Sequence, residues 1–571
     1  MEKGKTQTPQ AEVPLESWKA IANYLQRDVR TAQRWEQEES LPVHRHEHKK
    51  QATVYAFRQE IDAWRMQKEY APVTGSTGGR KPGWIPAAFI LLVLLALTTW
   101  WIIRSPGGAD APAIQKLIVV LPFQDLSHEP LVPLADALTE EIGARLASAN
   151  PERLAVIART SAMSFKASGS SIEEIRQHLN VDFALEGSVR RDGDMVRITA
   201  QLFDTGTRVR LWGASFDYTI RGWLELQQQA ATDIIGQIGT ALSIKQVATA
   251  QATLPDPDAY EHVLLGRHYF DQFNPESLTL ASQHFISALS NDSSYVEAYV
   301  GLARTQVASV WFGTMPAETA YREAVRTINL ALDLDPDNGD ALAILGWVEF
   351  VYRWNWAEAE QLMRKAVENQ PNSPWTHWFL ANYLSAMDRP DNAVASINAA
   401  LRLDPVSHYG LFARGYILSW AGQEAEAIEH LLAVKKRLGL PMIAGWLIEA
   451  YEIAGDFDSA IGVAEYLARP DSTRLRLAYS AEGDEGYWKA IAARKEEILT
   501  GRPDLFSYRY AVAMSKLGEL DKAIDMLERG YHQRAPTMVF LPVYPLQTLY
   551  GEPRFRDLVK RMNLEDVIPD E

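Results

Sequence analysis

The feature that most constrains this chain is an uninterrupted apolar segment near its amino-terminus. Residues 84–103 read WIPAAFILLVLLALTTWWII and contain no charged side chain. A helix of about 20 residues spans about 30 Å, the thickness of the hydrocarbon core of a bilayer. Tryptophans stand at both ends of the segment, where interfacial aromatic residues belong. The segment therefore predicts a single transmembrane helix over 84–103. A signal peptide is excluded because about 80 residues with folded character precede it.

Charge is distributed unevenly on the two sides of this segment. Residues 1–83 carry 14 Lys/Arg and 11 Asp/Glu, the remainder carries 43 and 62, and the net charge is −16. Arg80 and Lys81 precede the apolar segment and Arg104 follows it, which weakly favours a cytoplasmic amino-terminus. The absence of cysteine excludes disulfides, thiolate catalysis and Cys-ligated zinc.

The part before the apolar segment predicts a helix, a turn and a second helix. Apolar residues recur at helical spacing from Trp18 to Leu25, and Asp28 is placed to cap a second helix over 29–39. The stretch LPVHRHEHKKQATVYAF then has the alternation of a two-stranded wing, and FRQEIDAWRMQ returns to helical spacing. The second helix exposes a face of Arg and Gln, which pair two-pronged with guanine and adenine edges. A solvated amphipathic helix is the alternative interpretation of that face.

This pattern resembles the winged helix-turn-helix units of the excisionase and MerR-like type. The resemblance is carried by YLQRDVRTAQRW, by the wing and by EIDAW, and it departs from the family at Gln26, where a glycine is common. It implies that residues 1–70 form a domain that binds double-stranded DNA through the second helix and the wing. The predicted DNA-binding residues are Arg30, Thr31, Gln33, Arg34, Gln37, Arg45, Lys49 and Lys50.

Three alternating histidines in the wing raise a separate hypothesis of a metal site. His44, His46 and His48 would share one face of a strand. The favoured interpretation is a basic wing that contacts phosphates, so no metal or cofactor is predicted. Linkers are expected at 71–83 and 104–115, which are rich in Gly, Pro and small residues.

Residues 116–245 predict an α/β domain. KLIVVLPF is suited to a buried strand, and helical and strand-like segments alternate after it. The predicted order is β-α-β-α-β-β-β, followed by a helix from about Trp223. The domain resembles the amino-terminal α/β domain of TolB through VLPFQDLS, VIARTSAMSFK and DFALEGSVRRDGDMVRITAQLFDT. The resemblance implies assembly or sensing and no catalysis. A Ser/Lys nucleophile pair is not expected, because Ser164 precedes Lys166 by only two residues.

From residue 257 onward the sequence repeats with a period of about 34 residues, which predicts a helical solenoid. The clearest copies carry a small, a large and a small residue and then a proline, as in Ala359, Met363, Ala366 and Pro371. This spacing is similar to that of tetratricopeptide repeats, which implies an array over 257–535 with a capping segment over 536–571. Such arrays bind proteins or peptides. The tryptophans that line a groove in one interpretation and fill the core in the other are Trp354, Trp356, Trp375 and Trp378.

Together these segments predict a multidomain chain: a small α+β winged helix-turn-helix, one transmembrane helix, an α/β domain and an all-α tetratricopeptide solenoid. The organisation resembles membrane-anchored one-component regulators of the ToxR and CadC kind. It implies a non-enzymatic transcription regulator in the bacterial inner membrane, with a cytoplasmic DNA-binding domain and periplasmic sensing or protein-interaction domains. Dimerisation would join two DNA-binding units. The alternative is an envelope scaffold for protein–protein interaction that does not bind DNA.

Overall fold

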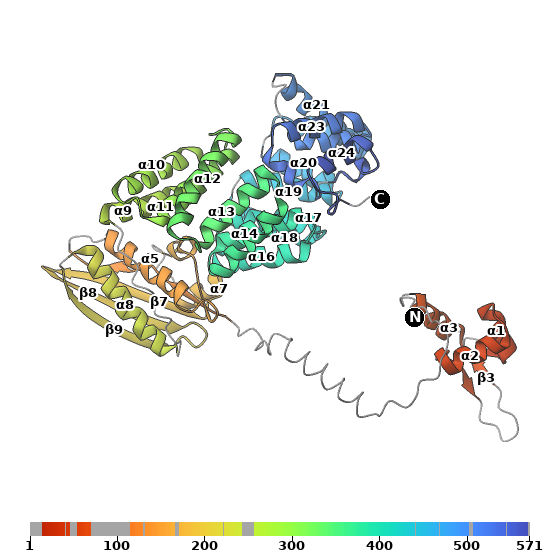
Figure 1. The fold of residues 1–571 in the computed structure, drawn as a ribbon, viewed down its shortest axis with the longest axis horizontal. Coiled ribbons are helices and arrows are strands. Elements are labelled where there is room, and N and C mark those ends of the chain that lie inside the picture. The colour runs from red at the N-terminus through yellow and green to blue at the C-terminus, as the bar shows by residue number, and fades with distance from the viewer. Residues whose placement is uncertain are drawn as a thin grey trace, which may run out of the picture. The chain divides into compact units, whose positions relative to one another are not determined.

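In the computed structural model, the chain divides into two compact units, Met1–Ala109 and Asp110–Glu571 (Figure 1). The described residues are 14–39, 41–45, 54–69, 115–128, 132–165, 171–220, 222–242, 256–439, 441–467, 469–501, 506–543 and 545–568. The predicted transmembrane segment 84–103 lies outside these residues, as do the linker 71–83 and most of the linker 104–115. Within the described ranges, no helix has the length and apolar character needed to cross a membrane.

The first unit contains three helices and a small antiparallel sheet among its described residues. The helices are α1 (Trp18–Leu25), α2 (Val29–Glu39) and α3 (Arg58–Glu69). The strands are β1 (Leu15–Glu16), β2 (His44–Arg45) and β3 (Val54–Ala56), with β3 in the centre. Residues from all three helices and from β3 form one buried cluster that includes Ile21, Leu25, Ala32, Ala56 and Ile61.

Local chemistry sets the turn between α1 and α2. Gln26 ends α1 in the left-handed conformation, with φ 53° and ψ 42°, which is the conformation that favours glycine at this position. The Asp28 carboxylate accepts a hydrogen bond from the Thr31 backbone N–H at 2.9 Å, which caps the next helix. Helix α2 therefore begins and ends at the residues predicted from the sequence.

The second unit begins with a mixed α/β domain. Its strands are β4 (Lys116–Val120), β5 (Gln124–Asp125), β6 (Leu154–Val156), β7 (Phe183–Asp192), β8 (Met195–Asp204) and β9 (Arg210–Thr219). Its helices are α5 (Val132–Ala149), α6 (Arg159–Met163), α7 (Ile172–Leu179) and α8 (Trp223–Ala241). The strand order is β6-β4-β7-β8-β9, with β5 paired to β7. Strand β4 is parallel to β6 and β7, whereas β7, β8 and β9 are antiparallel.

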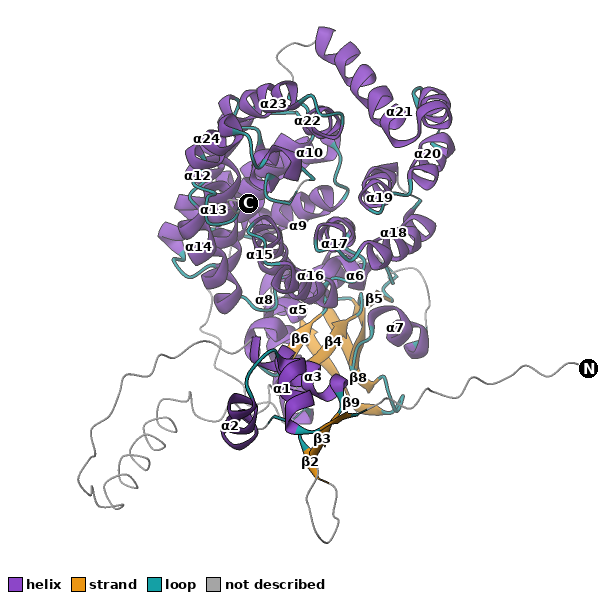
Figure 2. Ribbon diagram, turned by 90° about the vertical axis from the view of Figure 1, so that its right-hand side faces the viewer, coloured by secondary structure: helices purple, strands orange, loops and turns teal. Residues whose placement is uncertain are grey.

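Alternating residues of β4 supply the two faces of this sheet. Ile118 and Val120 pack in the cluster that contains α5 and α8, whereas Leu117 and Val119 pack in the cluster that contains α6 and α7. The second cluster also contains Leu403, which belongs to the helical array. One face of the sheet is therefore completed by a residue of the next domain, and Figure 2 shows α16 close to β4 and β6.

The rest of the second unit is a series of paired helices. Their bounds are α9 (Pro257–Asp271), α10 (Pro275–Asn291), α11 (Val296–Trp311), α12 (Ala317–Leu334), α13 (Gly339–Val348), α14 (Trp356–Asn369), α15 (Pro374–Ala386), α16 (Pro390–Leu403), α17 (His408–Trp420), α18 (Glu424–Leu438), α19 (Pro441–Ile453), α20 (Phe457–Tyr466), α21 (Ser472–Gly501), α22 (Tyr508–Lys516), α23 (Leu520–His532) and α24 (Pro553–Arg561). Short η segments lie at Glu349–Arg353 (η1), Pro536–Phe540 (η2) and Gln547–Leu549 (η3). Each helix packs against the next one along the chain, as expected of a solenoid.

The C-terminal helices return to the middle of the array. The Trp356 indole N–H donates a hydrogen bond of 2.8 Å to the backbone oxygen of Met562, 206 residues away. Trp354 lies against Tyr531, and Phe350 lies against Phe540. A single buried cluster accordingly extends from residue 300 to residue 568. The capping segment thus packs on α22 and α23 before it and also on α15 and the η1 region in the middle of the array.

Candidate DNA-binding and protein-interaction surfaces

Helix α2 presents the predicted DNA-binding face of the first unit. Ala32 is fully buried and Trp35 packs against Trp64 with ring centroids 5.6 Å apart, which fixes the inner side of the helix. Arg30 and Arg34, four residues apart, are both exposed on the other side. The structure therefore places two cations in one row on α2.

Some of the residues predicted to contact DNA are engaged within the protein or partly buried. The Thr31 hydroxyl donates to the Asp28 carboxylate at 2.7 Å, and this hydrogen bond is the main cause of the lowered pKa of Asp28. Thr31 thus serves the helix cap. Gln33 is partly buried, and Gln37 lies at the C-terminal end of α2.

The wing is described only in part. Arg45 lies in β2, whereas Lys49 and Lys50 lie outside the described residues, as do His46 and His48. His44 contacts Glu60 at 2.6 Å between its Nε2 and the carboxylate, and its ring stacks on Tyr55. Among the described residues, no three potential metal ligands gather around a common point.

The array contains the predicted small–large–small sets in its core. Ala359, Met363 and Ala366 are all fully buried. The same holds for Ala393 and Ile397, for Ala324, Ile328 and Ala331, and, at 3% exposure, for Ala400. The prolines that follow these sets each stand two residues after the end of a helix, where a residue without a backbone N–H cannot extend it. The residues at this spacing are therefore the ones that pack in the buried core of the hairpins.

Two of the four tryptophans singled out in the sequence lie in the buried interior of the array. Trp354 and Trp378 are 5% and 3% exposed. Trp356 is held by its hydrogen bond to the C-terminal segment, and Trp375 stacks on Tyr409 with ring centroids 4.0 Å apart. The core interpretation is therefore confirmed for Trp354 and Trp378, whereas Trp356 and Trp375 are partly buried.

The segment η2 also covers part of the array surface. Phe540 contacts Phe350 at 6.2 Å and Trp420 at 5.0 Å between ring centroids, and η2 packs on α15. No local pattern in the sequence predicts this contact, since the partners are more than 100 residues apart. A protein or peptide partner must use another part of the array or displace this segment.

The α/β domain and the array share a polar interface. The Ser161 hydroxyl donates to the fully buried carboxylate of Asp404 at 2.6 Å and accepts from the Val406 N–H at 3.1 Å. Burial raises the pKa of Asp404. The Asn372 amide donates to the backbone oxygens of Ala147 and Leu154 at 2.9 and 3.0 Å.

No pattern in the sequence predicted this interface. The RTSAMSFK segment was considered only for a Ser/Lys nucleophile pair, which was not expected. Within that segment Ser161 is an interface residue, Ser164 bonds to the Ser161 backbone oxygen, and Lys166 lies outside the described residues. The two domains therefore meet through the buried Asp404 carboxylate and the partly buried Asn372 amide, which come from different repeats and bond to residues of the α/β domain.

Comparison with known proteins identifies one part of the array directly. Residues 376–407 match the family model described as "Tetratricopeptide repeat". These residues cover most of α15 and the whole of α16.

One curated relative is "Putative adenylate cyclase 3" of Rhizobium meliloti (strain 1021), 29% identical over 287 residues. The match covers 48% of this chain and 41% of that protein, so the chain spans about two fifths of the length of the relative it matches. More than half of that relative lies outside the match.

Among solved structures, parts of the chain are similar to the following two at low sequence identity. A thermophilic tetratricopeptide protein of Thermus thermophilus is 16% identical, with 34% of this chain and 98% of that chain covered and a TM-score of 0.28. The pilF protein of Pseudomonas aeruginosa is 19% identical, with 38% and 92% covered and a TM-score of 0.28. These scores are low, so the assignment rests on the family match and on the buried hairpin residues. The chain carries tetratricopeptide repeats, with residues 376–407 as the matched copy.

Proposed function

We propose that the second unit is a protein-interaction scaffold in which the α/β domain and the tetratricopeptide array act as one body. The observation that supports this proposal is the run of stacked hairpins with buried small–large–small sets. The hydrogen bonds from Ser161 to Asp404 and from Asn372 to the α/β domain join the two parts. Arrays of this kind present an extended surface to proteins or peptides.

Cross-linking of the full-length protein in its own cells, followed by mass spectrometry, tests the scaffold. We expect cross-links to a recurring partner to map to α9–α23. Ile286 and Leu330 are 51% and 44% exposed, so changing them to serine leaves the core intact. We expect this double variant to lose cross-links to the partner. Cross-links confined to residues 14–69 would contradict the proposal. So would cross-links that are scattered over many unrelated proteins in the same way for the parent protein and the variant.

A second function is favoured by the geometry of the first unit, which we propose binds double-stranded DNA. Its support is the α1–turn–α2 arrangement with a three-stranded sheet and with Arg30 and Arg34 exposed on α2. Joined to the predicted helix 84–103, this unit makes the protein a membrane-tethered transcription regulator of the bacterial inner membrane. Its first unit would be cytoplasmic and its second periplasmic, and a homodimer would bring two DNA-binding units together. A cyclase activity is not part of the proposal, because less than half of the relative with that name is matched.

Replacing Arg30 and Arg34 with alanine tests the DNA-binding proposal. We expect the full-length protein in lipid nanodiscs to lose about 30-fold or more in affinity for its own upstream DNA, because each Arg that contacts a base contributes about 1–3 kcal/mol and the variant removes two. The slope of log affinity against log salt should also fall by about 2 if both contact phosphates.

The matched control removes the same charge from the other two helices. Lys19 lies on α1 and Arg58 on α3, and both are exposed. The double variant Lys19→Ala/Arg58→Ala should keep sequence-selective binding. An equal loss of affinity in both double variants would show that the effect comes from net charge and not from contacts of α2. If the parent protein showed no sequence-selective binding, the DNA-binding proposal would be wrong and the scaffold role alone would remain.

A further inference from the structure

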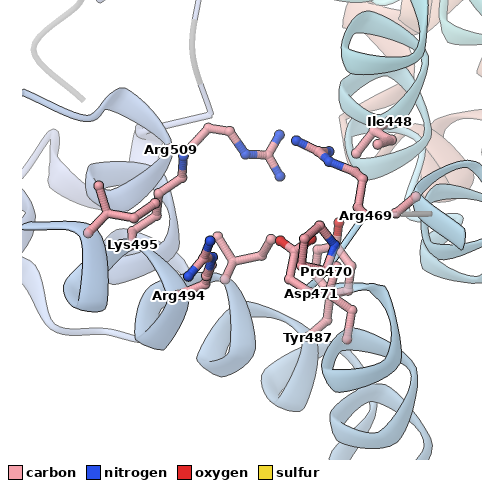
Figure 3. Close-up of a pocket in the computed structure, with 12 residues that line it drawn as sticks. Ile448, Arg469, Pro470, Asp471, Tyr487, Arg494, Lys495 and Arg509 are labelled. Atoms are coloured by element: carbon pink, nitrogen blue, oxygen red, sulfur yellow. The ribbon is translucent and has the colours of Figure 1, made fainter. Parts of the chain in front are cut away.

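A cavity of about 230 Å³ lies between α19, α20, α21 and α22 in the C-terminal half of the array. Four cationic side chains line it, from Arg469, Arg494, Lys495 and Arg509, together with the single carboxylate of Asp471. Figure 3 shows the guanidinium groups of Arg469 and Arg509 facing one another across the space. The cavity is separate from the interface with the α/β domain and from the segment η2.

The charges around this cavity are only partly balanced within the protein. Arg509 donates two hydrogen bonds to the Glu452 carboxylate, at 3.0 and 2.5 Å, and Arg494 donates one to Glu497 at 3.2 Å. In the part of the chain that the structure describes, the side chains of Arg469 and Lys495 make neither a hydrogen bond nor an ion pair. Two cations therefore face the cavity with one carboxylate, Asp471, to balance them.

The pKa of Lys495 reports the same imbalance. Burial lowers this pKa first, and the positive charges of Arg509, Arg469 and Arg494 lower it further, against a smaller opposite effect of Asp471. Bringing like charges together is unfavourable unless an anion joins them. An anion in the cavity would remove this repulsion.

The remaining wall of the cavity is apolar. Ile448, Leu475 and Ile491 line it and are buried. The Tyr487 hydroxyl is occupied by its hydrogen bond to Glu452, so the residue offers its ring to the cavity. A bound molecule can therefore place an anionic group among the cations and an apolar or aromatic body against this wall.

We propose that this cavity binds a small phosphate monoester, with the phosphate between Arg469 and Lys495 and the organic body against Ile448, Tyr487 and Ile491. A phosphate monoester carries close to two negative charges at neutral pH, so its oxygens can pair with Arg469 and with Lys495 at the same time. The planar guanidinium of Arg469 can bond two phosphate oxygens at once, and the Lys495 ammonium adds a point charge. A carboxylate carries a single charge and two oxygens, so it would pair less strongly with both cations than a phosphate does. This site does not depend on the scaffold or on the DNA-binding function.

Titration calorimetry on the detergent-solubilised full-length protein tests the site with three probes: phenyl phosphate, inorganic phosphate and benzoate. We expect phenyl phosphate to bind with one-site saturation. Inorganic phosphate, which lacks the body, and benzoate, which lacks the second charge, should each bind at least tenfold more weakly. Binding of the dianion should also raise the pKa of Lys495, so proton uptake should accompany binding at alkaline pH.

Two variants and one control assign the residues. Arg469→Gln and Lys495→Met should each weaken phenyl phosphate binding at least tenfold, and Lys495→Met should abolish the proton uptake. Lys489→Met is the control, because Lys489 lies on the same helix but pairs with Glu482 and Glu485 at 2.7 and 2.8 Å, outside the cavity. Thermal unfolding of each variant checks that the array is intact.

Each other result would overturn the assignment. Tighter binding of benzoate would make the cavity a carboxylate site. Equal binding of phenyl phosphate and inorganic phosphate, unchanged in both variants, would show only unspecific anion attraction. No saturable signal up to about 10 mM phenyl phosphate would limit the binding free energy to less than about 3 kcal/mol. The cavity would then have no phosphate ligand of this class.

Discussion

Gly187→Ala is expected to destabilise the α/β domain by about 3 kcal/mol, the upper part of the range for overpacking a closed core. A Cβ atom at Gly187 would overlap the Phe123 ring. Phe123 is 3% exposed in the cluster under α5 and α8, so the ring has little room to move. Hydrogen–deuterium exchange in peptides from β4 and β7 measures the loss as faster exchange of amides that are protected in the parent protein.

Gly143→Ala is the matched control for this substitution. Gly143 lies in the interior of α5, and beyond the backbone of its own helix no atom lies within 4 Å of the place where a Cβ would stand. Alanine there should be neutral or stabilising by about 0.5–1 kcal/mol, because glycine is unfavourable inside a helix. In the double variant Phe123→Leu/Gly187→Ala, the smaller side chain should recover part of the loss. An exchange pattern for Gly187→Ala equal to that of Gly143→Ala would show that the ring relaxes freely.

Glu449→Gln is expected to change the pH dependence of array stability. Burial raises the pKa of Glu449 to about 7, although the hydrogen bond from the Trp420 indole at 3.0 Å and the charge of Arg509 oppose this shift. A raised folded-state pKa favours the protonated carboxyl. The stabilisation is fully present below the ordinary value of 4.5 and is lost as the pH rises through about 7.

The glutamine side chain keeps an acceptor for Trp420 and does not ionise. The parent protein should therefore lose on the order of 2 kcal/mol relative to Glu449→Gln between pH 4.5 and pH 8, after partial solvent exposure is discounted. Exchange of amides in α19, measured across this pH range and corrected for intrinsic rates, gives the difference.

Glu465→Gln is a control of opposite sign. The hydrogen bonds from Arg476 lower the pKa of Glu465, so its contribution is lost as the pH falls. Parallel pH profiles for the parent protein and Glu449→Gln would contradict the assignment of a raised pKa to Glu449.

Local sequence signals determined much of the secondary structure. Asp28 predicted the start of α2 because an N-cap needs only its own backbone neighbours, and the structure shows that hydrogen bond. The repeat positions Ala359, Met363 and Ala366 predicted buried contacts because each hairpin buries the same face against the next. The run of apolar residues in KLIVVLPF predicted a buried strand, which is β4. In each case the deciding interactions lie within about one repeat.

Other parts stay predictions. The residues proposed to contact DNA include Arg30 and Arg34 on α2, but exposure alone does not identify a ligand. The segment 84–103 carries the strongest compositional signal of the chain and lies outside the described residues.

The sequence by itself determined the repeat register, the cap of α2 and the buried strand β4, because these depend on neighbours along the chain. Only the tertiary structure decided three other features. Ser161 meets Asp404 across 243 residues, Phe540 reaches Phe350 and Trp420, and Arg469 meets Lys495 and Arg509 around one cavity. The first two contacts join residues more than 100 positions apart, so no window of one repeat contains both partners. The third set lies within about one repeat, but it depends on how α19, α20, α21 and α22 pack around the cavity, which no local pattern specifies.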